Sequence, residues 1–156
     1  KVKYVLELDT TRYVPTSLTL MDNNKRKTSL DAIIKQAQGK VIYVDFWASW
    51  CGPCRAAFPH SVKLRESLKD KNIVFVYLSI DKSMEAWLKA SEKEELNEYP
   101  NNFLVLNSQD ADFLKQQKVN SIPRYMIVDK RGKLIYPNAP RVESKELTQL
   151  LTELSK

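Results

Sequence analysis

Two cysteines, Cys51 and Cys54, are the residues of this chain whose type and spacing best suit covalent chemistry. They are the only cysteines among 156 residues, and Gly52 and Pro53 separate them. A thiolate attacks a disulfide sulfur, and a second thiol nearby can then displace the substrate from the mixed disulfide. The spacing therefore predicts a pair that alternates between two thiols and one disulfide.

The segments on either side of the pair predict how it is held. Residues 41–47 (VIYVDFW) are almost all apolar, which is typical of a central strand buried on both faces. A helical pattern follows Cys51 and runs to about Lys69, so we expect Cys51 at a helix N-terminus, where unpaired N–H groups and the helix dipole stabilise a thiolate. Pro53 suits the first turn because it has no N–H.

Zinc binding is the main structural alternative for the cysteine pair. Tetrahedral zinc needs four ligands, and beyond Cys51 and Cys54 the chain offers one histidine, His60, and carboxylates. An accidental pair of buried thiols is a second alternative, which the flanking Trp, Gly and Pro residues disfavour. We therefore expect no metal and no cofactor beyond the redox-active Cys51–Cys54 disulfide, and we interpret His60 as a lone surface residue.

Asp45 is anomalous, because it lies in the middle of the strand predicted to be buried. An isolated carboxylate in an apolar interior is costly to ionise, so we expect its pKa to be raised. We predict that Asp45 exchanges a proton with Cys54, directly or through a water molecule, as that thiol attacks or leaves. The alternative is a polar residue satisfied by hydrogen bonds that the sequence does not reveal.

The two tryptophans before the cysteine pair are expected to differ in exposure. Adjacent residues before a helix start point in different directions, which places Trp47 in the core and Trp50 at the surface beside Cys51. An exposed apolar platform favours contact with unfolded substrates, so Trp50 is a candidate substrate-binding residue.

Strand and helix patterns alternate along the chain, which predicts crossover units around a central sheet. Further strands are expected at residues 2–8, 17–21, 25–28, 73–80, 103–106, 124–128 and 133–136. Helices are expected at residues 30–37, 52–69, 82–100, 110–118 and 147–154. The acidic helix at 82–100 is interpreted as an insertion, with Met84, Trp87 and Leu88 facing inward and Glu92, Glu94 and Glu95 outward.

Composition and charge limit the class of protein. Hydrophobic residues make up 43% and charged residues 28%, which is typical of one globular domain over residues 1–156, with residues 1–12 as an N-terminal extension or strand. The formal net charge of +6 is spread along the chain, so no nucleic-acid binding is expected. No stretch approaches the roughly 18 apolar residues of a membrane-spanning helix, and no signal-peptide core follows Lys1. We expect a soluble monomer that has been trimmed or processed.

Several segments together resemble a known protein family. Residues 44–55 (VDFWASWCGPCR) closely resemble the active-site segment of thioredoxins. The preceding hairpin and helix, the Cys54-x-x-x-x-Pro59 spacing, and residues 121–124 (SIPR) with 128–133 (VDKRGK) resemble the TlpA/ResA-type branch. The resemblance covers approximately residues 13–155. It implies an α/β, thioredoxin-like sandwich with a central mixed sheet, an added N-terminal β-hairpin and a helical insertion, and an activity in thiol–disulfide exchange.

The resemblance also implies roles for individual residues. Cys51 would be the attacking thiol and Cys54 the resolving thiol. Pro123 would be a cis-proline that exposes the backbone of Ile122, which could pair with an extended substrate segment. The expected substrate-binding surface is completed by Trp50, Gly52, Pro53 and Arg124.

Two positions depart from the family pattern. The TlpA/ResA-type branch commonly has an acidic residue three positions after the second cysteine, where this chain has Ala57, so proton exchange would fall more fully to Asp45. Arg124 stands where many cytosolic thioredoxins have threonine, so their partner set is not carried over. The Gly-Pro dipeptide between the cysteines resembles reducing members, which favours reduction over oxidation.

The expected partners are protein thiol or disulfide substrates and an upstream electron donor. The resemblance implies a bacterial cell envelope or periplasm, with the cytoplasm as the alternative. Two other functions are left open. A peroxiredoxin-like peroxidase would require a cysteine in a Pro/Thr-rich loop ahead of a helix, which this sequence lacks, and a binding domain would keep its cysteines without using them.

Overall fold

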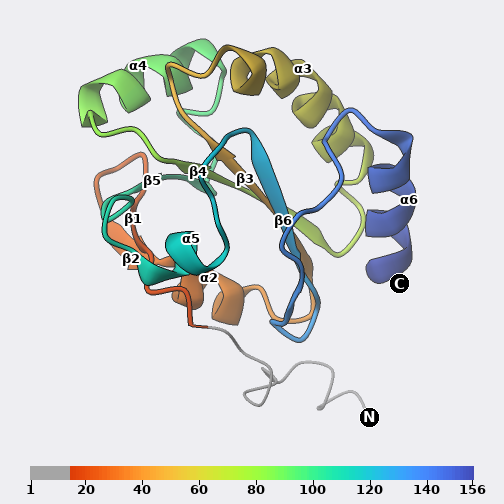
Figure 1. The fold of residues 1–156 in the computed structure, drawn as a ribbon. Coiled ribbons are helices and arrows are strands. Elements are labelled where there is room, and N and C mark those ends of the chain that lie inside the picture. Colours follow the sequence, from red (N-terminus) through yellow and green to blue (C-terminus); the bar gives the residue numbers. More distant parts are fainter. Residues whose placement is uncertain (1–14) are drawn as a thin grey trace.

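The computed structural model describes residues 15–156, so the strand expected at residues 2–8 lies outside the described residues. The helices are α2 (Leu30–Gln36), α3 (Gly52–Ser67), α4 (Met84–Lys93), α5 (Asp112–Gln116) and α6 (Lys145–Leu154). The strands are β1 (Thr19–Met21), β2 (Lys27–Ser29), β3 (Val41–Trp47), β4 (Ile73–Ser79), β5 (Asn102–Val105), β6 (Arg124–Val128) and β7 (Leu134–Tyr136). Figure 1 shows these elements.

The strands form one mixed sheet in the order β2-β1-β5-β4-β3-β6-β7. β3 runs parallel to β4, and β4 runs parallel to β5, whereas the remaining neighbours are antiparallel. All seven residues of β3 pair with β4 on one side, and five of them pair with β6 on the other. The prediction of a central strand before the cysteines is confirmed.

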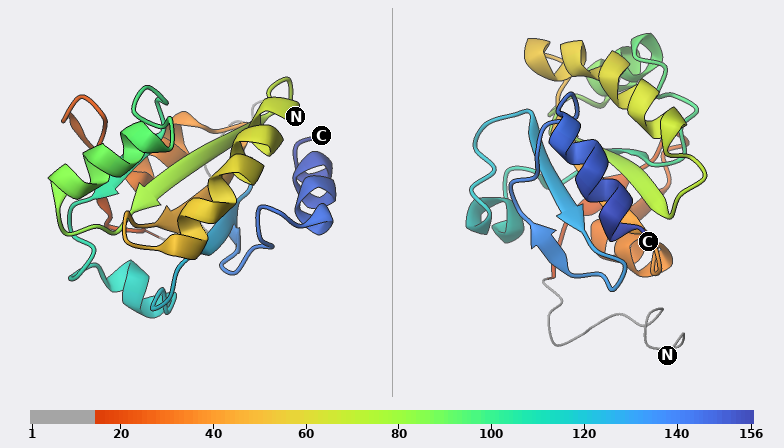
Figure 2. Two further views of the ribbon diagram at one scale, coloured as in Figure 1. Left: turned by 90° about the horizontal axis from the view of Figure 1, so that it is seen from above. Right: turned by 90° about the vertical axis from the view of Figure 1, so that its right-hand side faces the viewer.

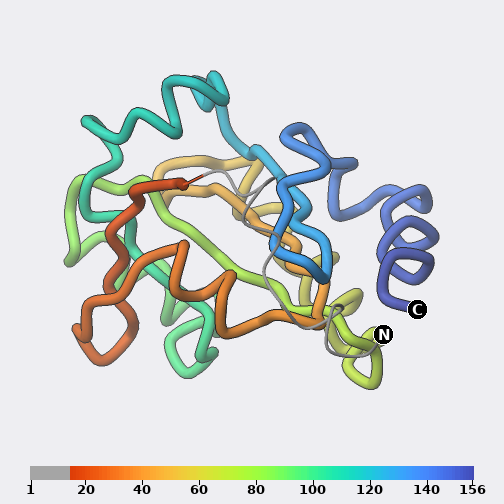
Figure 3. The backbone as a smooth tube through the Cα atoms, turned by 90° about the horizontal axis from the view of Figure 1, so that it is seen from below, coloured from red at the N-terminus to blue at the C-terminus, as the bar shows by residue number. Residues whose placement is uncertain are grey.

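Alternating residues of β3 pack into two separate hydrophobic cores. Tyr43 and Trp47 belong to the core beneath α3, α4 and α6. Ile42, Val44 and Phe46 belong to the core beneath α2 and α5 on the opposite face. Figure 2 shows α3, α4 and α6 lying over one side of the sheet, and Figure 3 shows the other side, with α2 in orange. The result is the predicted sandwich of helices around a mixed sheet.

The N-terminal hairpin is confirmed, with β1 and β2 paired in antiparallel register. The side-chain amide of Asn23, in its turn, donates to the carbonyl oxygens of Leu96 and Tyr99, at 3.1 and 3.0 Å. These bonds tie the hairpin to the segment that follows α4.

Helix α4 is shorter than the range expected at 82–100. Ser83 caps it by accepting the N–H of Ala86, and Trp87 is fully buried, as predicted. The expectation that Met84 faces the core is wrong, because its side chain is 40% exposed. Met84 is the first residue of the helix, one turn before the buried stripe begins, where the core no longer covers it.

Candidate active site

The connection from β3 to α3 places Cys51 at the N-cap of the helix. Its Sγ accepts the backbone N–H of Cys54 at 3.2 Å, so a sulfur takes the position of a capping oxygen. The two cysteines form a disulfide, with their Cα atoms 5.3 Å apart. Unpaired N–H groups and the positive end of the helix dipole meet at this position, which favours a thiolate on Cys51 after reduction.

The cysteine pair lies between an exposed rim of residues and the buried core. Trp50 is 68% exposed and Trp47 is fully buried, which confirms the predicted difference between the two tryptophans. Gly52 and Pro53 are exposed in the first turn of α3, whereas Cys51 and Cys54 are 5% and 2% exposed. A partner can therefore approach over Trp50 and the exposed first turn of α3, and both cysteines lie at the edge of the core below them.

The loop before β6 lies against the cysteine pair. The peptide bond between Ile122 and Pro123 is cis, and the carbonyl oxygen of Ile122 lies 3.8 Å from Sγ of Cys51. The guanidinium of Arg124 donates to three backbone carbonyl oxygens, those of Gln117, Lys118 and Pro137, at 2.8 to 3.1 Å. These bonds hold the start of β6 to the end of α5 and to the residue that follows β7. A role for Arg124 in substrate binding stays a prediction.

Asp45 is buried in the middle of β3, as the strand pattern predicts. It is 4% exposed, and its neighbours across the sheet are Tyr77 on β4 and Tyr125 on β6. Its Oδ1 has no hydrogen-bond partner among residues 15–156. Burial without such a partner raises the pKa of Asp45 to about 8, since the ionised form is poorly solvated there.

A second buried carboxylate, Asp81, holds the loop that carries Cys51, and the sequence reasoning missed it. Its oxygens accept hydrogen bonds from the N–H and hydroxyl of Ser49, at 2.9 and 2.6 Å, and from the hydroxyl of Ser79 at 2.6 Å. Three donors satisfy this carboxylate, in contrast to Asp45. One signal was present in the sequence, because Ser49 and Asp81 each follow one of two adjacent parallel strands, whose carboxyl ends meet at one edge.

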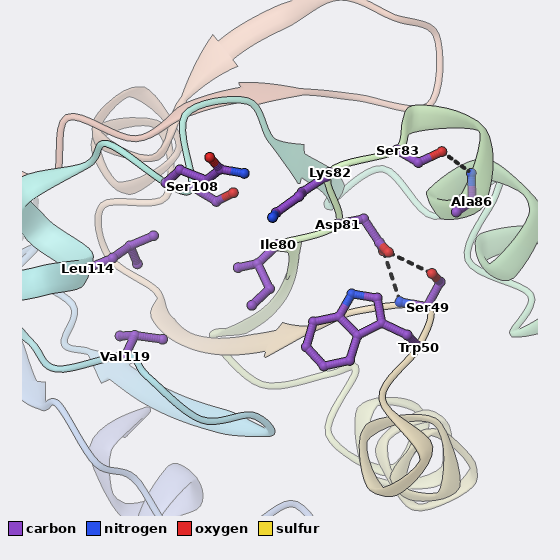
Figure 4. A pocket seen from close by; sticks show the side chains of 11 residues that line it. Ser49, Trp50, Ile80, Asp81, Lys82, Ser83, Ala86, Ser108, Leu114 and Val119 are labelled. Atoms are coloured by element: carbon purple, nitrogen blue, oxygen red, sulfur yellow. Dashed lines mark hydrogen bonds between the residues drawn. The ribbon is translucent and has the colours of Figure 1, made fainter.

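A recess of about 530 Å³ opens beside Trp50, away from the buried core. Figure 4 shows the indole of Trp50 on one side and Leu114 and Val119 on the other, with the Lys82 side chain directed toward the space between them. Ile80 and Ala86 add further apolar surface. The walls are thus mostly apolar and continue from the residue that precedes Cys51.

Other features of the described residues bear on ligands. His60 is exposed on α3, as predicted for a lone surface histidine. Within residues 15–156, no three histidine, cysteine or acidic side chains gather closely enough to hold a metal ion. In the same residues, no helix combines the length and apolar character that crossing a membrane requires.

Comparison with known proteins finds both sequence and structural relatives. Residues 11–153 match the family model described as Redoxin. The thiol-disulfide oxidoreductase ResA of Bacillus subtilis (strain 168) is 24% identical over 119 residues, which are 76% of this chain and 62% of that protein. ResA of Bacillus thuringiensis subsp. konkukian (strain 97-27) is 24% identical over 122 residues, 78% of this chain and 68% of that protein.

Solved structures extend the similarity to nearly the whole chain. The thioredoxin domain of a thiol-disulfide oxidoreductase from Bacteroides vulgatus is 26% identical, with a TM-score of 0.73 over 92% of this chain and 99% of that one. A solution structure of a Bacteroides vulgatus protein described as a thiol-disulfide oxidoreductase is 30% identical, with a TM-score of 0.76 over 94% of this chain and 93% of that one.

A disulfide-forming cysteine pair at the start of a helix, on a sandwich of this topology, defines a thioredoxin-like thiol–disulfide oxidoreductase. The chain belongs to the Redoxin family, in its TlpA/ResA-type branch.

Replacement of Asp45 by asparagine is expected to stabilise the oxidised protein, and the gain should grow with pH. Because the folded-state pKa of Asp45 is raised to about 8, folding favours the protonated acid, and the side chain destabilises the fold progressively between about pH 4 and about pH 8. We expect D45N to raise the free energy of unfolding little near pH 4 and by about 1 kcal/mol or more near pH 8. Urea denaturation at the two pH values measures both gains.

Asp70→Asn is the matched control for this measurement, because Asp70 is exposed in the turn after α3. Its substitution should change the stability by less than about 0.5 kcal/mol at either pH. A D45N protein that is less stable than the wild type near pH 8 would show that the carboxylate is well satisfied in the fold.

Proposed function

We propose that the chain reduces disulfide bonds in proteins of the bacterial cell envelope through the Cys51–Cys54 pair. The observation that carries the proposal is the position of Cys51, whose sulfur caps α3 and forms a disulfide with Cys54 in the first turn of that helix. The N-cap position favours ionisation of the Cys51 thiol, and Cys54 lies close enough to attack the mixed disulfide once it has formed. Gly52 and Pro53 between them leave the approach open.

The reaction proceeds by two exchanges with balanced electrons. The Cys51 thiolate attacks one sulfur of the substrate disulfide, which forms a mixed disulfide and releases the other substrate sulfur as a thiolate that takes up a proton. Cys54, as a thiolate, then attacks Sγ of Cys51 and releases the second substrate thiol. Two electrons pass to the substrate, and the protein ends as the disulfide observed in the structure. An upstream dithiol donor must reduce that disulfide before the next cycle.

Asp45 supplies the base for the second exchange. A carboxyl group whose pKa is near 8 is mostly protonated at neutral pH, and its ionised fraction is a stronger base than an ordinary carboxylate and can take the proton of a thiol. It lies on the same buried side of β3 as Tyr43 and Trp47, within the core to which Cys54 also belongs. Ala57, buried on α3, offers no acid that could replace it.

The exposed rim of the site is suited to an extended protein segment. The backbone of Ile122 beside Sγ of Cys51 can pair with such a segment in the manner of an added strand. Trp50 and the apolar recess beside it can receive a side chain that flanks the substrate cysteine. The rim thus favours unfolded or flexible protein substrates over small peroxides.

The relatives support thiol–disulfide exchange as the type of reaction. Matches of about 24% identity to ResA proteins and of 26% to a thiol-disulfide oxidoreductase of Bacteroides vulgatus cover most of the described fold. The Gly-Pro sequence between the cysteines adds support for reduction. A turbidity assay of insulin reduction with dithiothreitol as donor tests the activity, and a peroxide-consumption assay without a reductase tests the peroxidase alternative.

Cys51→Ser is expected to abolish disulfide exchange, whereas Cys54→Ser should leave the first attack intact and accumulate mixed disulfides with the substrate. Only the resolving step is lost in C54S, so the covalent adduct has no intramolecular route to release. Non-reducing electrophoresis and mass spectrometry of each variant, after incubation with a disulfide-containing protein, measure the adduct. A trapped adduct that persists in C51S but is missing in C54S would reverse the two roles.

Asp45→Asn should slow protein-disulfide reduction by about tenfold or more near neutral pH, with the loss shrinking at higher pH, where hydroxide can take the proton of Cys54. The initial rate of insulin reduction as a function of pH measures this effect. The matched control is the same substitution in a C54S background, in which attack of Cys51 on an aromatic disulfide should be unchanged. An equal loss in that background would mean that Asp45 serves Cys51 or the fold in general.

A further inference from the structure

Arg55, the residue after Cys54, joins the redox loop to helix α4. Its Nε donates to Oε2 of Glu94 at 2.7 Å, and its Nη1 donates to the carbonyl oxygen of Ser49 at 3.1 Å. Ser49 lies two residues before Cys51, and Glu94 is the C-cap residue of α4. The guanidinium of Arg55 therefore links three parts of the fold: the loop before Cys51, the first turn of α3 and the C-terminal end of α4.

The Arg55–Glu94 ion pair is less exposed than the Lys69–Glu66 ion pair at the end of α3. The side chains of Arg55 and Glu94 are 29% and 19% exposed, whereas those of Lys69 and Glu66 are 64% and 72% exposed. Water and salt screen partly buried charges less than they screen surface charges. The expectation that Glu94 faces outward is therefore wrong, because its carboxylate turns toward α3 and bonds to Arg55.

The two charges act on the redox pair in opposite directions. A cation in the first turn of α3 stabilises a thiolate on Cys51, and a carboxylate bonded to that cation offsets part of its effect. Ser49 is also held by Asp81, so the loop stays anchored at one side when the contact with Arg55 is lost. The other charged side chains around the loop are unchanged in the variants considered below: Asp45, Asp81, Lys82 and Arg124.

We infer that Glu94, acting through Arg55, is a positioning residue that sets the reduction potential of the Cys51–Cys54 pair. With Glu94 neutralised, the charge of Arg55 is uncompensated and stabilises the reduced form, whose Cys51 is ionised. Neutralising Arg55 has the opposite effect and favours the disulfide. This inference rests on the proposed thiolate chemistry of Cys51 and adds to it a residue of α4 that touches neither cysteine.

The test is equilibrium exchange with glutathione, in which the protein disulfide and two glutathione thiols give the protein dithiol and one glutathione disulfide. Glu94→Gln, which retains an oxygen that can accept from Arg55, should shift this equilibrium about threefold or more toward the dithiol. Arg55→Gln should shift it about threefold or more toward the disulfide. A threefold change is about 14 mV for this two-electron couple.

Three further variants separate charge from structure. Arg55→Lys keeps the cation and should stay closer to the wild type than R55Q does. The double variant R55Q/E94Q should return toward the wild-type equilibrium, because both charges are gone. Glu66→Gln removes the carboxylate of the exposed pair on α3 and should leave the equilibrium unchanged.

Opposite signs for E94Q and R55Q support the inference, because a merely structural ion pair would shift the equilibrium in one direction whichever partner is removed. Shifts of the same sign, or a change of less than about 1.5-fold in E94Q, overturn it. E94Q decides the question alone if R55Q does not fold. The proposed function has a test of its own: it is overturned if Cys51 of the wild-type protein forms no mixed disulfide with a protein substrate.

Discussion

The chemistry of this protein depends on a sulfur atom held at the N-cap of a helix that starts at the end of a buried strand. Sγ of Cys51 accepts the N–H of Cys54 at 3.2 Å, which places the sulfur among the unpaired N–H groups of the first turn. β3, paired on both sides, delivers Cys51 to this position, and the bonds from Ser49 to Asp81 keep the connecting loop there. Strand β3, the loop after it and helix α3 therefore act together to stabilise the thiolate of Cys51.

The same strand carries Asp45, the group that we propose as the base for the second exchange. Among residues 15–156 the Oδ1 of Asp45 has no hydrogen-bond partner, and burial raises its pKa to about 8, so the folded chain keeps this group largely protonated at neutral pH at a cost in stability. Large aromatic side chains pack around it in the same core, including Trp47, Tyr43 and Tyr125. Burial of these rings offsets the cost of the carboxylate, and the protein keeps a proton acceptor in a place that water reaches poorly.

The parts of the site that lie within one segment could be predicted from the sequence, whereas the contacts between segments could not. The buried strand, the helix start at Cys51 and the burial of Asp45 follow from apolar runs and local spacing. The bonds of Ser49 to Asp81 and of Arg55 to Glu94 join residues 32 and 39 positions apart. These are residue types that usually face solvent, so only the packing of α4 and β4 against the loop selects them. The three carbonyl contacts of Arg124 span only 6 to 13 positions, but they depend on how the loop before β6 folds, which the sequence pattern does not specify.

The most direct test of this account is the pH dependence of alkylation of the fully reduced protein, with the modified cysteine identified by mass spectrometry. The account predicts that iodoacetamide at limiting concentration labels Cys51 first, with an apparent pKa well below the ordinary thiol value of about 8.5, and that Cys54 reacts slowly throughout. Preferential labelling of Cys54, or a Cys51 thiol that titrates at or above the ordinary value, would contradict the claim that the N-terminus of α3 makes Cys51 the attacking group.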